Sequence, residues 1–418
     1  MSAEENGYVH EMVEQAEIET LGSQGDGVTA DGIFVPRSLP GETVKIVANG
    51  HRATLSEIIR AAPDRVEPAC KHFGNCGGCA VQHASDGLVA GWKQAQVHKA
   101  LAARGIAGVE IRPVITSPPR SRRRATFTAR RTKKGSLSGF HASASDQIVQ
   151  VDECQVVEPE ILALKAGLHD LVVAGASRKG ELRITITTSE GGLDVSVTGG
   201  KPVEGALYGN LVAIAATSDL ARLSWDGEAV VIRRPPVQRM GRARVVPPPG
   251  GFLQATAHGE ATLVEAVRNA IGDARMIADL FCGSGTFALV LAETAEVLAI
   301  ETEAEALKAL DAGWRQAEGL KRIETETRDL FHRPLLDRQL DGIEAVVLDP
   351  PRQGARAQAE QLARSTVQRI AAVSCNPATF ARDARTLIDG GFNLDWVQPV
   401  DQFRWSPHIE LAAQFTRT

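Results

Sequence analysis

The sequence lacks any apolar run as long as the ~20 residues that a membrane-spanning helix needs. The first fifteen residues also lack the basic start and the apolar stretch of a secretory signal peptide, so we expect a cytoplasmic protein. Cysteine is scarce, with six in 418 residues, so clustered cysteines suggest metal ligands or nucleophiles before they suggest a disulfide framework. The composition is 43% hydrophobic and 23% charged, which excludes wholesale disorder.

Composition and hydrophobic pattern predict four parts. Residues 1–15 are polar, and residues 16–65 carry short β-prone runs between glycines and prolines, as in a small OB-like β-barrel. Residues 66–240 hold three close cysteines, a helix over 88–101 and strand-like runs that predict a mostly antiparallel α+β domain. A segment rich in proline, glycine and arginine ends this part. Residues 241–418 then alternate apolar strands with helices, which predicts a parallel, doubly wound α/β domain.

A glycine-rich turn follows the first strand of that α/β domain. Gly283 and Gly285 permit a tight turn, and eighteen residues after Gly283 the next apolar run ends in Glu301, where a carboxylate can accept both hydroxyls of a ribose. The third glycine of the dinucleotide fingerprint is missing, so the pattern predicts a nucleoside-binding turn. Asp329 lies where the third strand should end, beside the expected adenine, and Cys282 is predicted to be a buried packing residue.

Two polar clusters, Asp-Pro-Pro-Arg at 349–352 and Ser-Cys-Asn-Pro at 374–377, follow later apolar runs. The aromatic residue that enzymes methylating exocyclic amines usually carry after Asp-Pro-Pro is absent, and Arg352 replaces it. A thiol suits a ring carbon instead: Cys375 can add to carbon 6 of uracil, which makes carbon 5 nucleophilic towards a sulfonium methyl group. Glu410 is the candidate base that removes the carbon 5 proton, with His408 as the alternative. Asp349 could hydrogen-bond the ring, and Arg352 could stabilise the thiolate.

Four motifs in order, FCGSGTF, LDPPRQG, SCNPATFARD and HIE, resemble the uracil-5-methyltransferase family that acts on ribosomal and transfer RNA. The resemblance covers nearly the whole chain and implies a class I (Rossmann-like) methyltransferase domain that uses S-adenosyl-L-methionine. It implies Cys375 as nucleophile and Glu410 as base. The residues that it implies around the cofactor are Gln254, Phe281, Gly283, Thr286, Glu301, Asp329 and Asp349. Thr286 departs from the asparagine that some members carry at this position.

The remaining cysteines are Cys70, Cys76, Cys79 and the distant Cys154. Four thiolates fit either a tetrahedral zinc ion or a [4Fe-4S] cluster, and a triplet with one distant ligand favours iron–sulfur. In the resembling RNA methyltransferases this arrangement holds a [4Fe-4S] cluster. The preceding segment, GSQGDGVTADGIFVPRSLPGETVKI, resembles the TRAM domain, an OB-like barrel that binds RNA.

No acidic residue occurs between Glu110 and Asp146, although the net charge of the chain is −5. Eight basic residues crowd together within this interval: Arg120, Arg122, Arg123, Arg124, Arg130, Arg131, Lys133 and Lys134. With Phe127 and Phe140 interleaved, they predict a surface that follows RNA phosphates and stacks bases. The target uridine must be unstacked, which favours loops.

The barrel and the cysteine cluster resemble the enzymes of 23S ribosomal RNA. We therefore expect a monomer that binds 23S RNA and neither DNA nor a membrane. Two alternatives are a transfer RNA uracil-C5 methyltransferase and an iron–sulfur RNA-binding protein with an inert methyltransferase domain.

Overall fold

The computed structural model describes residues 13–417. Residues 1–12 of the polar segment predicted at 1–15 therefore lie outside the described residues. The chain divides into two compact units. The smaller covers residues up to 92 together with 405–407, and the larger covers 93–404 together with the residues from 408 on. Within 13–417, no helix has both the length and the apolar character that crossing a bilayer requires.

A closed five-stranded barrel forms the centre of the smaller unit, in the order β1-β2-β3-β5-β4. Ile18, Val35, Val44 and Ile46 fill its interior and are almost fully buried. Closing the sheet pairs the strand edges, which suits a small domain with many turns. The small barrel predicted from the short β-prone runs between glycines and prolines is confirmed. Its strands are β1 (Val13–Leu21), β2 (Gly27–Thr29), β3 (Phe34–Val35), β4 (Thr43–Asn49) and β5 (Arg52–Arg60).

The first half of the larger unit is a seven-stranded sheet in the order β10-β9-β8-β11-β12-β13-β14, in which only β12 and β13 pair in parallel. Helices α2 to α4 pack their apolar side chains on it, and Leu171, Leu211 and the strand residue Ile184 belong to one buried cluster. The mostly antiparallel prediction is confirmed. The elements are β8 (Arg124–Thr132), β9 (Gly135–His141), β10 (Ile148–Val149), α2 (Pro159–Ala163), α3 (Lys165–Gly175), β11 (Glu181–Ser189), β12 (Gly192–Thr198), α4 (Ala206–Thr217), β13 (Arg222–Trp225) and β14 (Glu228–Ile232).

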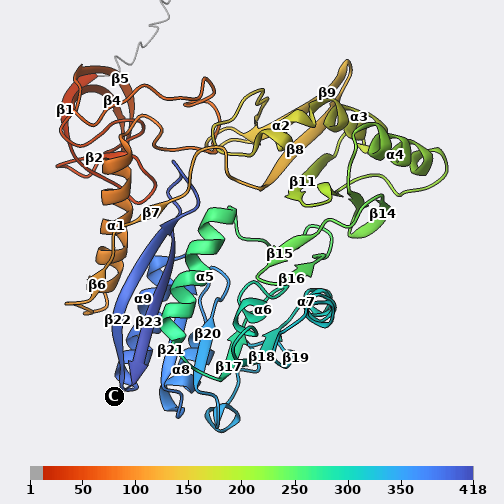
Figure 1. Cartoon of the computed structure of the whole chain (residues 1–418). Helices are drawn as coiled ribbons and strands as arrows, with labels where there is room; N and C mark the ends of the chain where they lie inside the picture. The colour runs from red at the N-terminus through yellow and green to blue at the C-terminus, as the bar shows by residue number, and fades with distance from the viewer. Residues whose placement is uncertain (1–12, 418) are drawn as a thin grey trace, which may run out of the picture. The chain divides into compact units, whose positions relative to one another are not determined.

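The second half of the larger unit is a nine-stranded sheet, ordered β19-β18-β17-β20-β21-β23-β22-β6, with β7 also paired to β22 (Figure 1). Five strands from β19 to β21 are parallel, as predicted, but β23 runs antiparallel between β21 and β22. The prediction of a purely parallel sheet was therefore wrong at this edge. The connection between β22 and β23 is short and can join only antiparallel neighbours, because a parallel crossover needs about a dozen residues or more.

The strands of this sheet are β6 (Glu110–Ile111), β7 (Ile115–Thr116), β17 (Met276–Leu280), β18 (Glu296–Glu301), β19 (Ile323–Thr327), β20 (Ala345–Leu348), β21 (Arg369–Ser374), β22 (Phe392–Asp401) and β23 (Glu410–Arg417). Its helices are α5 (Ala257–Ile271), α6 (Ala288–Leu291), α7 (Ala304–Gln316), the 3-10 helix η1 (Asp337–Leu340), α8 (Arg356–Arg364) and α9 (Pro377–Asp389). Helix α1 (Asp86–Ala102) matches the helix predicted at 88–101, and strands β15 (Gln238–Met240) and β16 (Ala243–Val245) pair within the proline-rich segment.

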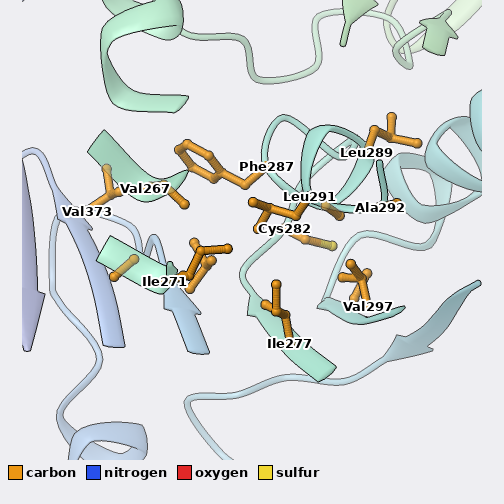
Figure 2. Close-up of a cluster of buried hydrophobic side chains, with 14 of the residues drawn as sticks. Val267, Ile271, Ile277, Cys282, Phe287, Leu289, Leu291, Ala292, Val297 and Val373 are labelled. Carbon is orange, nitrogen blue, oxygen red and sulfur yellow. The ribbon is translucent and has the colours of Figure 1, made fainter. Parts of the chain in front are cut away.

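Both faces of the sheet are buried at its central strands β17, β20 and β21, which explains why these strands read as largely apolar runs. Ile277 belongs to a cluster with α5, α6 and α7, whereas its neighbour Ala278 belongs to a second cluster with α8 and α9. Figure 2 shows the first cluster, in which Cys282 lies among Ile277, Phe287 and Val297. Cys282 is thus the buried packing residue that the sequence predicted.

The order of the strands fixes where a ligand can bind. From β17 the chain adds β18 and β19 on one side and β20 and β21 on the other, so the direction of winding reverses at β17. In open α/β sheets, ligands bind beside the carboxyl ends of the strands at such a reversal. The turns that follow β17, β18, β20 and β21 therefore contain the candidate site.

Candidate functional site

The turn after β17 has the backbone geometry of a tight loop against a helix. Phe281, Gly283 and Gly285 have φ angles of 64°, 54° and 100°. A Cβ atom on Gly285 would lie 2.8 Å from Cδ1 of Leu289, so glycine is required there for space as well as conformation. The Gly283 amide donates a hydrogen bond to Oε2 of Glu301 at 3.0 Å, which ties the glycine turn to the end of β18.

Asp329 lies two residues beyond the end of β19, as predicted. Its Oδ1 accepts the Phe331 amide at 2.9 Å and its Oδ2 lies 2.7 Å from Nδ1 of His332. The hydrogen bond from His332 lowers the pKa of Asp329. The ring of Phe331 lies 5.2 Å from that of Phe281, and Thr286 is half-buried in the turn. Phe331 was missed, although an aromatic residue two positions after a candidate adenine contact was a usable signal.

The predicted nucleophile and base come from neighbouring strand ends. Cys375 follows the last residue of β21, and Glu410 is the first residue of β23. These two strands pair antiparallel with Ser374 opposite Leu411, so the register places Cys375 and Glu410 side by side at the edge of the sheet. Asp349 follows the end of β20, the next strand along the sheet. The structure thus brings together three residues that lie far apart in the sequence.

Burial and mutual repulsion raise the pKa values of Glu410 and Asp349 into the neutral range. Burial raises the pKa of Glu410 to about 8, and the charge on Asp349 adds to this effect, while a hydrogen bond from Gln402 opposes it. Burial, with the charge on Glu301, raises the pKa of Asp349 to about 7. Glu410 is therefore mainly protonated at pH 7 and becomes a base only as the pH rises.

The Cys375 thiol is less acidic than the sequence suggested. Burial raises its pKa to about 11, with further contributions from Glu410 and Asp349. Arg352 lowers this pKa, as expected of a nearby cation, but does not offset the two carboxylates. The alternative base, His408, is exposed and its ring lies edge-on to Phe403 at 5.9 Å.

Asp279, the next-to-last residue of β17, was missed in the sequence. It is fully buried, and among the described residues 13–417 neither of its carboxyl oxygens has a hydrogen-bond partner of good geometry. Burial raises its pKa to about 8, helped by Asp349, while the nearby Ala288 amide lowers it. An acidic residue inside an otherwise apolar strand was the available signal, because a buried carboxyl without a partner is costly unless a ligand uses it.

Gln254 precedes α5 and is buried in a network that links both halves of the larger unit. Its side-chain Oε1 accepts a hydrogen bond from Nε2 of Gln402 at 2.6 Å. Its backbone oxygen accepts one from Nε of Arg123 at 3.0 Å, and Arg123 is also paired with Glu260 at 2.5 Å. Gln402 was not recognised in the sequence, because no local pattern marks it.

The basic interval is only partly an exposed surface. Arg123 is buried in its ion pair with Glu260, and Arg130 is paired with Glu181. Phe127 is 3% exposed and its ring stacks on Phe140 at 4.8 Å within the core of the seven-stranded sheet. The prediction that Phe127 stacks on bases was therefore wrong: its period-2 position on β8 faces inward. The exposed basic residues of the interval are Arg120, Arg130, Lys133 and Lys134.

The cysteine triplet lies in one loop of the smaller unit. Gln82 links two of its members, accepting the Cys70 amide at 3.1 Å and donating to Sγ of Cys79 at 3.2 Å. Cys154 belongs to the larger unit, and all six cysteines are thiols without a disulfide. Within 13–417, no three histidine, cysteine, aspartate or glutamate side chains are grouped closely enough to hold a metal ion.

Comparisons with known proteins show which family this chain resembles. The family model described as tRNA (uracil-5-)-methyltransferase matches residues 248–418. A protein named as an RNA methyltransferase in Brucella suis is 45% identical, over 96% of this chain and 98% of that protein.

A Nitrosococcus oceani protein named 23S rRNA (uracil(1939)-C(5))-methyltransferase RlmD is 30% identical, over 97% of this chain and 96% of that protein. Among solved structures, the Pyrococcus abyssi tRNA (uracil-54, C5)-methyltransferase with S-adenosyl-L-homocysteine matches with a TM-score of 0.74. The identity is 23%, and the match covers 96% of this chain and 99% of that one, which supports the class I methyltransferase fold. From these matches, this chain belongs to the family of RNA uracil-5 methyltransferases.

Proposed function

We propose that this protein transfers a methyl group from S-adenosyl-L-methionine to carbon 5 of a uridine in 23S ribosomal RNA, through a covalent adduct between Cys375 and carbon 6. The observation that carries the proposal is the pairing of β21 with β23. It places a thiol and a buried carboxyl with a pKa near neutrality side by side. The reaction needs a nucleophile and a base on one pyrimidine ring, and this arrangement supplies both.

Cys375 and Glu410 act in sequence. The Cys375 thiolate adds to carbon 6, and the electron pair of the 5,6 double bond makes carbon 5 nucleophilic, so that carbon 5 takes the methyl group. Glu410 then removes the carbon 5 proton, the double bond re-forms and the carbon 6–sulfur bond breaks, which returns Cys375 as a thiolate. Arg352 stabilises the thiolate in both states, because its charge lowers the pKa of Cys375.

The residues at the strand ends fit S-adenosyl-L-methionine, which supplies the methyl group as an electrophilic sulfonium. Glu301, fixed by the Gly283 amide, would accept the ribose hydroxyls, and Phe281, Thr286 and Asp329 would line the adenosine. The buried carboxyls of Asp279 and Asp349 suit a ligand with cationic groups, because a cation relieves the repulsion that raises their pKa values. Gln254 would contact the cofactor and the target base.

The choice of 23S RNA rests on the name of the Nitrosococcus oceani relative and on the N-terminal barrel, which resembles a TRAM domain. Transfer RNA is the second candidate, favoured by the fold shared with the Pyrococcus abyssi enzyme. Purified 23S RNA and transfer RNA, both lacking 5-methyluridine, would be offered separately with labelled methyl donor. Label in 23S RNA alone is expected, and label in transfer RNA alone would overturn the choice.

Covalent catalysis is tested with RNA that carries 5-fluorouridine, because fluorine at carbon 5 cannot leave as a proton and the adduct is trapped. The protein should become linked to this RNA at Cys375 when the methyl donor is present. Cys375→Ala should bind RNA and form no adduct, whereas Cys282→Ala, which removes a buried packing thiol, should still be trapped. Failure of the unaltered protein to form the adduct would refute the mechanism.

We also propose that Cys70, Cys76, Cys79 and Cys154 ligate a [4Fe-4S] cluster. One observation supports it: Gln82 accepts the Cys70 amide and donates to Sγ of Cys79, and hydrogen bonds to sulfur are among the interactions that tune iron–sulfur clusters. Protein purified without oxygen should be brown and contain about four irons per chain. Colourless protein with one zinc per chain would overturn this proposal.

A further inference from the structure

We propose that Gln402 is a positioning residue that locks the side-chain amide of Gln254 in one orientation and so makes the site select uracil over cytosine. The inference rests on the proposed function. Gln402 lies in the connection between β22 and β23, and only 2% of its surface is exposed. It contacts Gln254, which precedes α5, and Glu410, the proposed base.

The orientation of the Gln402 amide follows from a partner whose role cannot change. The backbone N–H of Ala255 can only donate, and it lies 2.9 Å from Oε1 of Gln402. That oxygen is therefore the acceptor, and the NH2 group of Gln402 must be the donor on its other side. Its two hydrogens have two acceptors: Oε1 of Gln254 at 2.6 Å and the carboxyl of Glu410.

This arrangement dictates what Gln254 can offer to a substrate. Because Oε1 of Gln254 is already an acceptor for Gln402, its Nε2 group is left on the other side of the amide as the donor. Gln402 is the common neighbour of Gln254 and Glu410, so this donor lies close to the reacting ring. Uracil presents a carbonyl oxygen at carbon 4, which accepts a hydrogen bond. Cytosine presents an amino group there, which would face the donor of Gln254 without a bond.

The surroundings of Gln402 prevent it from turning. The preceding residue, Asp401, is paired with Lys93 at 2.6 Å, and both side chains are buried. On the other side, a Cβ atom on Gly259 would lie 2.8 Å from Cβ and 2.9 Å from Oε1 of Gln402, so α5 packs directly against this side chain. A glutamine held from both sides keeps its amide in one state, which a discriminating contact requires.

The test compares two RNAs that carry either 5-fluorouridine or 5-fluorocytidine at the target position, and measures the rate of adduct formation with each. Gln402→Glu, assayed at a pH high enough to ionise the new carboxyl, can still accept the Ala255 amide but cannot donate to Gln254. The Gln254 amide then turns to donate to the new carboxylate and presents Oε1 to the base. We expect the ratio of the uridine rate to the cytidine rate to fall at least tenfold, with the cytidine rate unchanged or higher.

Two further variants separate positioning from stability. Gly259→Ala pushes Gln402 from the side of α5 without adding charge, and it should lower the same ratio even if Gln402→Glu fails to fold. Gln398→Glu is the matched control: Gln398 is a buried glutamine on β22 that donates to the carbonyls of Pro113 and Pro399. The control should leave the ratio unchanged.

A purely structural role would slow both RNAs equally in Gly259→Ala or Gln402→Glu, and an unchanged ratio in a folded variant would overturn the assignment. The proposed function fails in a different way. If the unaltered protein forms no adduct with the 5-fluorouridine RNA, covalent catalysis is refuted whatever the variants do. If it forms the adduct and the variants keep the ratio, only the role of Gln402 is refuted.

Discussion

In the proposed mechanism, the formation and the resolution of the covalent protein–RNA adduct depend on different groups, so raising the pH should make this adduct accumulate. Resolution needs ionised Glu410, whose pKa burial raises to about 8. A carboxyl with a raised pKa keeps its proton below that value, so its ionised fraction is about 9% at pH 7, about 50% at pH 8 and about 91% at pH 9. Formation needs the Cys375 thiolate, whose pKa is about 11. Its fraction rises about tenfold per pH unit throughout this range.

The ratio of the two rates gives the magnitude. From pH 7 to 8, formation gains about tenfold and resolution about fivefold, so the adduct should roughly double relative to released product. From pH 8 to 9, formation again gains about tenfold while resolution gains less than about twofold, so the adduct should increase about fivefold. Ordinary RNA and the methyl donor are mixed with the protein and stopped in detergent at short times. The linked and free methylated RNA are then separated on a denaturing gel.

A ratio that stays constant or falls between pH 8 and 9 would refute the assignment of Glu410 as the group that resolves the adduct. Cys282→Ala should reproduce the profile of the unaltered protein, because its thiol lies in the apolar core. RNA binding measured over the same range separates loss of affinity from loss of chemistry.

Three other predictions follow. Glu410→Gln should accumulate adduct already at pH 7 and slow product release by about 10²-fold or more, because the amide cannot take the carbon 5 proton. The same change removes a charge that raises the pKa of Cys375, which favours adduct formation. Normal product release in single-turnover measurements would reassign the base. Binding of S-adenosyl-L-methionine should release protons, because a cation favours the ionised forms of Asp279 and Asp349, and its affinity should rise from pH 6 to 8; calorimetry in two buffers that shows no proton release would contradict this. Replacing exposed Lys133 and Lys134 with glutamine should reduce the log-log salt slope of RNA binding by ~1.4 if each contacts a phosphate, and an unchanged slope would remove them from the interface.

The strand ends of the site were predictable because strands buried on both faces are continuous apolar runs, so the first polar residues after them stand out. This applies to Glu301, Asp349 and Cys375, which all follow such runs. Burial of an individual charged residue was not predictable in the same way. Arg123 and Lys133 lie in one basic interval, but Arg123 is buried in an ion pair with Glu260 while Lys133 is exposed. Glu260 lies 137 residues further along the chain, so no local pattern predicts this pair.

Gln402 illustrates a second limit of local pattern. A glutamine in a connection between strands is ordinary, and its importance arises only from the Ala255 amide and the Gln254 side chain, which fold back from more than 140 residues away. The position of β23 was likewise not predictable from the sequence, because a hairpin at the edge of a sheet can pair with the sheet through either of its two strands. The sequence predicts the residue types of the site, whereas the tertiary register determines which of them touch.

The position of β23 also has a consequence for how the protein is assembled. In the chain, β23 follows β22, yet in space it lies between β21 and β22. During synthesis, the strands from β17 to β21 can pair with one another as they emerge. β22 cannot join the sheet in its final position until β23 is available to pair with both β21 and β22. We expect the hairpin of β22 and β23 to dock as one piece. An incomplete chain would then carry Cys375 without Glu410. In the proposed mechanism, the step that completes the fold therefore also supplies the carboxyl that lets the enzyme release the methylated RNA.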